Sequence, residues 1–252
     1  MQTKTSRYGQ LAILLLALIQ SITLSQAHSA EPQRNKKVLF VLSAHSSGYW
    51  LPEVIKPYQD LTDNGYQVEF ATPLGAQGKA MAASQLNSRL KKAYRRIESI
   101  LASPRHLRHI ESKDYLAIYF PGGAGPMFDL VDHPEVNRLV KAFHQEDKII
   151  AALCHGPAAL TYVTLENGEP LLSGLKITGK SNAEESFWAR QRYPFLIEDK
   201  FKALGSHYSA AEPKEAHIVY DSPVLTGQNP QSTALLSKEL IKLLKNNKGS
   251  NI

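Results

Sequence analysis

Short apolar runs rich in β-branched residues alternate with helical stretches along most of this chain, and this alternation constrains its fold most strongly. The predicted strands are 36–43, 67–72, 116–120, 148–153, 217–221 and 224–226, and the predicted helices are 50–64, 134–145 and 232–245. Strands that alternate with helices predict βαβ units and a parallel sheet. Because the strands lack polar alternation, helices should cover both faces. We therefore predict an α/β fold, a three-layer sandwich with a mostly parallel sheet.

Residues 77–112 form a predicted helical insertion between the second and third strands. Apolar residues recur there at helical spacing, namely Leu86, Leu90, Tyr94, Ile97 and Leu101. The other side of the helix is basic, with Arg89, Lys91, Lys92, Arg95 and Arg96. A basic face can bind nucleic acid or a membrane surface. We favour a solvated face on a helix that covers the domain.

The first 30 residues are typical of an export signal. Lys4 and Arg7 precede an apolar run at 11–19, and small residues at signal-peptidase spacing predict cleavage after Ala27 or Ala30. The apolar run is short for a membrane anchor, which remains the alternative. Residues 31–252 would then form a single domain, exported to the periplasm or secreted, with no stable membrane span.

Composition excludes several classes of protein. The chain has 252 residues, 43% of them hydrophobic and 21% charged, which excludes a disordered chain, a collagen and a multi-pass membrane protein. The net charge is +6, and +4 without the leader, a mild excess that does not indicate a nucleic-acid partner. Cys154 is the only cysteine, so no intramolecular disulfide can form.

Cys154 stands where an apolar strand runs into a helical pattern, in the segment Ala151-Ala-Leu-Cys-His-Gly-Pro-Ala-Ala-Leu160. A sharp strand-to-helix turn of this kind lifts a nucleophile out of the sheet. The positive end of the following helix is expected to lower the pKa of the thiol. The alternative is a buried structural cysteine beside a buried histidine.

Two further features belong to the same edge of the predicted sheet. Phe120-Pro-Gly-Gly-Ala-Gly125 follows the third strand, and its glycines can bring bare backbone N–H groups to a reacting oxygen. A plain turn is the alternative. Glu53 lies among apolar neighbours at the start of the helix after the first strand, where a carboxyl group can shuttle protons or simply favour the helix dipole.

These motifs resemble those of the PfpI superfamily, the family of the Parkinson-disease protein DJ-one, with its class I glutamine-amidotransferase-like, flavodoxin-like fold. The resemblance spans about 36–245 and is nearest to the branch of small heat-shock chaperones and glyoxalase III enzymes. It rests on ordered motifs: Pro52-Glu53 with Pro57, Ala71–Gly75, Pro121–Gly123, Ala152–Ala159, Ile177–Gly179, Asn182–Glu185, Pro194–Asp199 and Leu225–Pro230.

The resemblance implies a role for each matched residue. Cys154 corresponds to the nucleophile, and His155 to its neighbour in the catalytic triad. Glu185 corresponds to the acid that orients the histidine, with Glu184 as the alternative one position away. Glu53 corresponds to the carboxylate that touches the thiol and relays a proton.

The resemblance also implies a substrate pocket lined by Gly122, Gly123 and Ala124. The backbone N–H groups of Gly123 and His155 would form its oxyanion hole. Ala124 stands where many members of the branch have a histidine, so one hydrogen-bond donor is missing. Lys180 occupies a position usually held by an aromatic residue, where it could pair with Glu184 or Glu185, or alter the charge of the pocket.

The segment Gly174-Leu-Lys-Ile-Thr-Gly-Lys-Ser181 matches the phosphate-binding pattern G-x-x-x-x-G-K-[ST]. A phosphate loop must follow a strand and keep its N–H groups free. Here the expected strand, 175–178, lies inside the loop, so we interpret the match as chance and predict no cofactor. The nine histidines include no H-E-x-x-H pair, and we predict no metal.

Three classes of function remain open. The favoured one is a cysteine-dependent, glutathione-independent glyoxalase of hydro-lyase type, which converts methylglyoxal to lactate, or a related protein deglycase. The second is an amidase- or peptidase-type hydrolase acting on an acyl or amide substrate. The third is a stress chaperone or redox sensor with little turnover. The resemblance also implies a homodimer.

Overall fold

The computed structural model describes residues 36–246, which belong to one compact unit. The predicted leader at 1–30 lies outside the described residues. Within 36–246, none of the helices combines the length and the apolar character that crossing a membrane requires.

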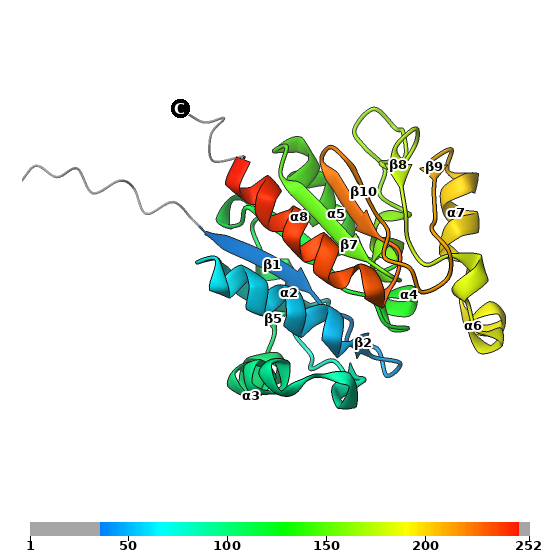
Figure 1. The fold of residues 1–252 in the computed structure, drawn as a ribbon. Coiled ribbons are helices and arrows are strands. Elements are labelled where there is room, and N and C mark those ends of the chain that lie inside the picture. Colours follow the sequence, from blue (N-terminus) through cyan, green and yellow to red (C-terminus); the bar gives the residue numbers. More distant parts are fainter. Residues whose placement is uncertain (1–35, 247–252) are drawn as a thin grey trace, which may run out of the picture. The chain divides into compact units, whose positions relative to one another are not determined.

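A seven-stranded sheet forms the middle layer, in the order β10-β11-β7-β6-β1-β3-β5 (Figure 1). Every neighbouring pair in it is parallel except β10 and β11. The strands are β1 (Lys37–Val41), β3 (Gln67–Thr72), β5 (Arg105–His106), β6 (Ala117–Phe120), β7 (Ile149–Leu153), β10 (Ile218–Asp221) and β11 (Val224–Gly227). The predicted α/β fold with a mostly parallel sheet is therefore confirmed.

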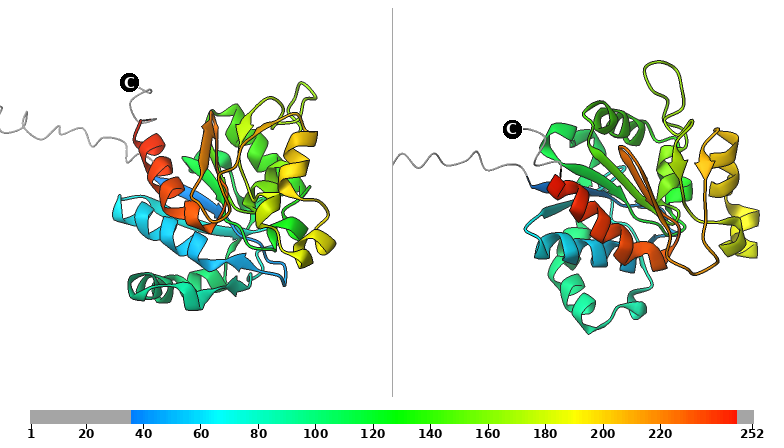
Figure 2. Two further views of the ribbon diagram at one scale, coloured as in Figure 1. Left: turned by 45° about the vertical axis from the view of Figure 1, so that its right-hand side comes forward. Right: turned by 45° about the horizontal axis from the view of Figure 1, so that its top comes forward.

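Helices cover both faces of this sheet (Figure 2). One face packs against α2 (Leu51–Asp63), α3 (Ser88–Ala102) and α8 (Thr233–Asn246). The other packs against α4 (Pro126–Asp129), α5 (Pro134–Gln145) and α7 (Ile197–Ala203). α6 (Phe187–Arg192) precedes α7. Within the described part of the chain, six 3-10 helices connect these elements: η1 (Ala83–Gln85), η2 (Leu107–His109), η3 (Ser112–Asp114), η4 (Gly156–Leu160), η5 (Asn182–Glu184) and η6 (Pro230–Ser232).

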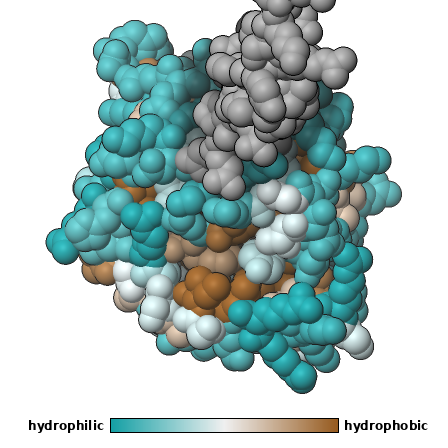
Figure 3. All heavy atoms as spheres, turned by 90° about the vertical axis from the view of Figure 1, so that its left-hand side faces the viewer, coloured by the Kyte–Doolittle hydropathy of each residue, from teal (hydrophilic) through white to brown (hydrophobic). Residues whose placement is uncertain are grey.

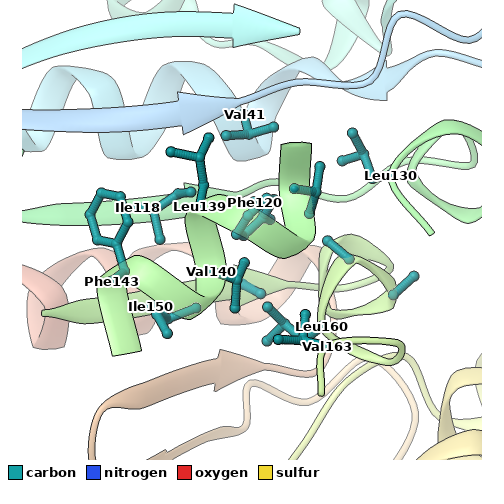
Figure 4. Packing of buried hydrophobic residues seen from close by; sticks show 14 of the residues in the cluster. Val41, Ile118, Phe120, Leu130, Leu139, Val140, Phe143, Ile150, Leu160 and Val163 are labelled. Atoms are coloured by element: carbon teal, nitrogen blue, oxygen red, sulfur yellow. The ribbon is translucent and has the colours of Figure 1, made fainter. Parts of the chain in front are cut away.

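Alternate residues of each central strand point to opposite faces and build two cores. In β1, Leu39 and Val41 enter one core, whereas Val38 and Phe40 enter the other. Figure 4 shows the first core, where three side chains of α5 lie over β6 and β7: Leu139, Val140 and Phe143. Because all of these strand residues are buried, the strands show the continuous apolar runs that predicted the sheet.

The segment between β3 and β6 contains α3 and several short elements. α3 turns Ala93, Ile97 and Leu101 inward. Its basic side chains are exposed, as a solvated face requires. β4 (Ala80–Met81) in this segment pairs with β2 (Tyr49–Trp50), and β8 (Lys176–Ile177) pairs with β9 (His207–Tyr208) elsewhere. On the face seen in Figure 3, hydrophilic residues surround a hydrophobic patch.

Candidate active site

Cys154 follows the last residue of β7 and adopts a left-handed backbone conformation, with φ of +58°. Few non-glycine residues tolerate this conformation, and such strain is concentrated at functional sites. The turn also requires Gly156, because a Cβ atom there would lie 2.0 Å from the carbonyl oxygen of Phe120. The thiol is therefore held at the carboxyl edge of the sheet, where ligand sites of open α/β sheets lie.

One expectation about this turn is wrong. The helix after Cys154 is the five-residue 3-10 helix η4, too short to provide a substantial helix dipole. Burial and the carboxylate of Glu53 raise the pKa of the Cys154 thiol, and the positive charge of Lys180 opposes them. The residue is only 5% exposed, so desolvation of the thiolate dominates.

The structure places Cys154, His155 and Glu185 in a row. His155 Nδ1 lies 3.5 Å from Cys154 Sγ, and His155 Nε2 lies 2.9 Å from Glu185 Oε1. The side chains of the histidine and the glutamate are 9% and 3% exposed, so the pair is shielded from water. A buried carboxylate on one ring nitrogen orients the imidazole toward the thiol. Glu185, and not Glu184, is the acid that contacts the His155 ring.

Glu184, the alternative, faces a different part of the molecule. Its Oε1 accepts hydrogen bonds from Lys214 N–H and Asn229 Nδ2, and its Oε2 accepts from Ser181 Oγ and Gln228 Nε2. These bonds lower the pKa of Glu184 despite its burial. Its carboxylate thus ties together the loops that follow β8, β9 and β11.

Glu53 is completely buried beside Cys154. Its Oε2 accepts a hydrogen bond of 2.7 Å from the backbone N–H of Gly122, whereas its Oε1 has no hydrogen-bond partner within 36–246. Burial raises the pKa of Glu53 to about 8, against the opposing effects of the Gly122 N–H, Lys180 and the Cys154 thiol. The carboxyl group is therefore mostly protonated at neutral pH, and a pKa this close to neutrality suits it to proton transfer.

The Gly122-Gly123 turn fits between Glu53 and Cys154 because it has no side chains. A Cβ atom on Gly122 would lie 2.7 Å from both Cys154 Cβ and Glu53 Oε2. Gly123 has a φ of +105°, and a Cβ atom there would lie 2.6 Å from the backbone nitrogen of Trp50. Ala124 follows, and its methyl group offers no hydrogen bond to a substrate. The geometry leaves the predicted role of Gly123 and His155 N–H as an oxyanion hole untested.

Aromatic side chains beside His155 were not singled out from the sequence. Tyr193 meets the His155 ring edge-on at 5.1 Å between centroids, and it also contacts Trp188 at 5.6 Å and Phe128 at 5.7 Å. His45, from the loop after β1, stacks on Phe128 at 4.6 Å. The clustering of Phe187, Trp188 and Tyr193 just after Glu185 was the available signal. These aromatic side chains line the part of the site in which His155 lies.

The phosphate-loop pattern at 174–181 does not form a phosphate loop. β8 lies inside it, and its backbone N–H groups already have partners: Gly174 with Gly205 O, Lys176 with Asp221 Oδ2 and Thr178 with Thr226 Oγ1. Among residues 36–246, no group of three or more His, Cys, Asp or Glu side chains is placed to hold a metal ion.

The sequence profile of the DJ-1/PfpI family matches residues 36–243. The chain belongs to the DJ-1/PfpI family. The resemblance inferred from the motifs is thereby confirmed, and the family match covers both the elbow at Cys154 and the Glu53 helix.

Proteins similar to this chain have been given different functional names. The bovine "Glutamine amidotransferase-like class 1 domain-containing protein 1" is 32% identical over 187 residues, which are 73% of this chain and 83% of the relative. "Glutathione-independent glyoxalase HSP31" of Saccharomyces cerevisiae is 25% identical over 234 residues, 84% of this chain and 99% of the relative. The X-ray structure of the Francisella tularensis "Rapid Encystment Protein 24 KDa" superposes with a TM-score of 0.79 at 29% identity, covering 83% and 99% of the two chains.

Proposed function

We propose that this protein is a glutathione-independent glyoxalase that converts methylglyoxal to lactate. The observation that carries the proposal is the pair of buried groups at its centre, the Cys154 thiol and the Glu53 carboxyl, whose pKa is raised to about 8. A glyoxalase needs a nucleophile for an aldehyde and a base that moves one proton between adjacent carbons. The yeast relative named a glutathione-independent glyoxalase supports this assignment.

In the first step, Cys154 Sγ adds to the aldehyde carbon of methylglyoxal. A carbon–sulfur bond forms, the carbonyl π bond breaks, and the oxygen takes up a proton to give a hemithioacetal. His155, 3.5 Å from the sulfur, accepts the thiol proton and returns it to that oxygen. Glu185 keeps the imidazole in place during this transfer.

In the second step, the minor ionised fraction of Glu53 removes the proton from the carbon that carries sulfur and delivers it to the neighbouring carbon. The hydroxyl proton of the hemithioacetal moves to the neighbouring ketone oxygen, so the adduct is isomerised without net loss of a proton. The first carbon is oxidised to a thioester and the second is reduced to an alcohol, so no external oxidant or reductant is required. A carboxylate whose conjugate acid has a pKa of about 8 is a stronger base than an ordinary one, which favours this step. Water then hydrolyses the thioester, which releases lactate and restores the thiol.

A hydrolase of amide or acyl bonds is the alternative class. It would use the same thiol and would need a proton donor for its leaving group, a role open to His155. The feature that favours the glyoxalase is the burial of the Glu53 carboxyl beside Cys154, where its Oε2 accepts from the Gly122 N–H. A carboxyl group there suits proton transfer on a small adduct.

The test is lactate formation from methylglyoxal without glutathione. We expect the parent protein to form lactate and Cys154→Ser to lose at least ~1000-fold in rate, because the nucleophile is removed. Far-ultraviolet circular dichroism and the urea midpoint establish that the variant is folded. Absence of lactate from a parent protein whose Cys154 is reduced and alkylable would contradict the proposal and favour a hydrolase or a chaperone.

We also propose that the protein acts after export, in the periplasm or outside the cell. The support is the leader pattern at 1–30, with its basic start and apolar run. An exported enzyme of this kind would meet reactive carbonyls away from the intracellular glutathione pool, where a glutathione-independent reaction is useful.

A further inference from the structure

Lys180 is a charged side chain at the edge of the site that the proposed reaction does not use. Its backbone N–H donates a hydrogen bond of 3.0 Å to the carbonyl oxygen of Cys154, so its side chain starts beside the nucleophile. That side chain is 15% exposed. Its positive charge acts on both Cys154 and Glu53, where it favours the ionised form of each.

Glu184 forms an ion pair with the Lys180 ammonium group but accepts no hydrogen bond from it. Glu184 Oε1 lies 3.7 Å from Lys180 Nζ, which is too long for a hydrogen bond. Both oxygens of Glu184 already accept from four other donors. Within residues 36–246, the Lys180 ammonium group donates no hydrogen bond. Its N–H donors are therefore open to a ligand, and an anionic group at the site can accept charge-assisted hydrogen bonds from them.

Glu184 is the carboxylate that forms an ion pair with Lys180, at 3.7 Å, and the carboxyl groups nearer the thiol do not. Glu53 is protonated below its pKa of about 8 and carries no charge. Glu185 is paired with His155 at 2.9 Å. A small anion that reaches Cys154 would therefore share the Lys180 ammonium group with Glu184, and it could accept the hydrogen bonds that Glu184 does not.

We propose that Lys180 makes this site selective for 2-oxoaldehydes that carry a carboxylate, an inference that rests on the proposed glyoxalase function. A suitable compound is 4,5-dioxopentanoate, whose far carboxylate would lie against the Lys180 ammonium group. Cys154 would add to its aldehyde carbon, and Glu53 would move the proton from that carbon to the neighbouring one. Water would release 2-hydroxyglutarate and the free thiol, so the compound gains one water molecule and no electrons.

The first experiment measures the anion preference of the thiol without any turnover. Cys154 is alkylated with iodoacetate and with iodoacetamide, which differ in charge, and each rate is followed by intact mass. We expect Lys180→Met to lower the iodoacetate-to-iodoacetamide rate ratio about tenfold, since one positive charge beside the thiol is removed. The control Lys176→Met removes an exposed lysine of β8 and should keep the parental ratio. An unchanged ratio in Lys180→Met, or equal losses with both reagents, would overturn the proposal.

The second experiment uses substrates. The parent protein should show a higher kcat/KM for 4,5-dioxopentanoate than for its methyl ester, and Lys180→Met should lower that ratio mainly through KM. Equal losses for acid and ester would mean that Lys180 acts only on the thiol, and would overturn the substrate class. Failure of the parent to turn over either compound while it still converts methylglyoxal would overturn the substrate class, whereas failure with methylglyoxal as well, with the alkylation preference intact, would refute the glyoxalase proposal itself.

Discussion

Glu53 and Cys154 are buried close together at the centre of the site, and burial raises the pKa of both groups. The carboxyl group has no hydrogen-bond partner at Oε1 among the described residues, and burial raises its pKa to about 8. The same burial raises the pKa of the thiol. At neutral pH the protonated carboxyl adds no negative charge next to the sulfur. The residue that we propose as the catalytic base is therefore also a source of pH-dependent stability.

We expect the stability of the parent protein to fall as the pH rises through the range set by Glu53. Below pH 4.5 the carboxyl is protonated in both the folded and the unfolded state. Between pH 4.5 and about 8 only the folded state keeps the proton, so the free energy of unfolding falls by up to ~1.4 kcal/mol per pH unit. Glu53→Gln removes this contribution, and its amide oxygen can still accept from Gly122 N–H. When the pH is raised from low to high, the free energy of unfolding of the variant, measured in urea, should increase by a few kcal/mol relative to that of the parent. A constant difference at all pH values would contradict the assigned pKa.

The principal site residues could be predicted from the sequence, whereas the walls of the site could not. Cys154 and His155 are neighbours in one motif, and Glu53 lies in another; both motifs resemble those of the PfpI superfamily. Tyr193 and His45 reach the site from separate loops, and their positions depend on how the chain packs around Phe128. The only local signal was the aromatic cluster after Glu185, to which Tyr193 belongs, and His45 had none.

At the scale of elements, one backbone hydrogen bond is missing from helix α2 at Glu53, and a side chain from the sheet replaces it. Pro57 lies inside this helix and has no N–H group, so the carbonyl oxygen of Glu53, four residues earlier, lacks its helical partner. The buried hydroxyl of Tyr119, from β6, donates to that oxygen at 2.9 Å. The Tyr119 hydroxyl thus replaces the missing helical hydrogen bond and links the Glu53 backbone to the central strand β6.

Tyr119→Phe is expected to destabilise the fold, because it leaves the Glu53 carbonyl oxygen buried without a partner. The loss should be about 1–3 kcal/mol. Tyr220→Phe is the matched control: it removes an exposed hydroxyl on β10, and it should change stability by less than ~0.5 kcal/mol. Urea midpoints of the three proteins give the comparison. Equal midpoints for Tyr119→Phe and the parent would mean that the hydroxyl does not support α2.

At the scale of the whole molecule, the alternation of apolar strands and helices was enough to predict the layers. β1, β6 and β7 are buried on both faces and therefore have continuous apolar sequences. The two-residue strand β5 was not predicted, because so short an edge strand has no periodicity to detect. The segment after Cys154 was expected to be an ordinary helix, yet close packing of Gly156 against Phe120 accompanies a 3-10 turn. The leader, outside the described residues, stays a prediction.

The most direct test of the account separates the two steps assigned to Cys154 and Glu53. Glu53→Gln should still form the hemithioacetal, seen as protection of Cys154 from iodoacetamide by methylglyoxal, because the nucleophile remains. Its lactate formation should fall by about 100- to 10,000-fold, since the base that moves the proton is gone. Lactate formation by Glu53→Gln at the parental rate would contradict the central claim that this buried carboxyl carries the proton between the two carbons.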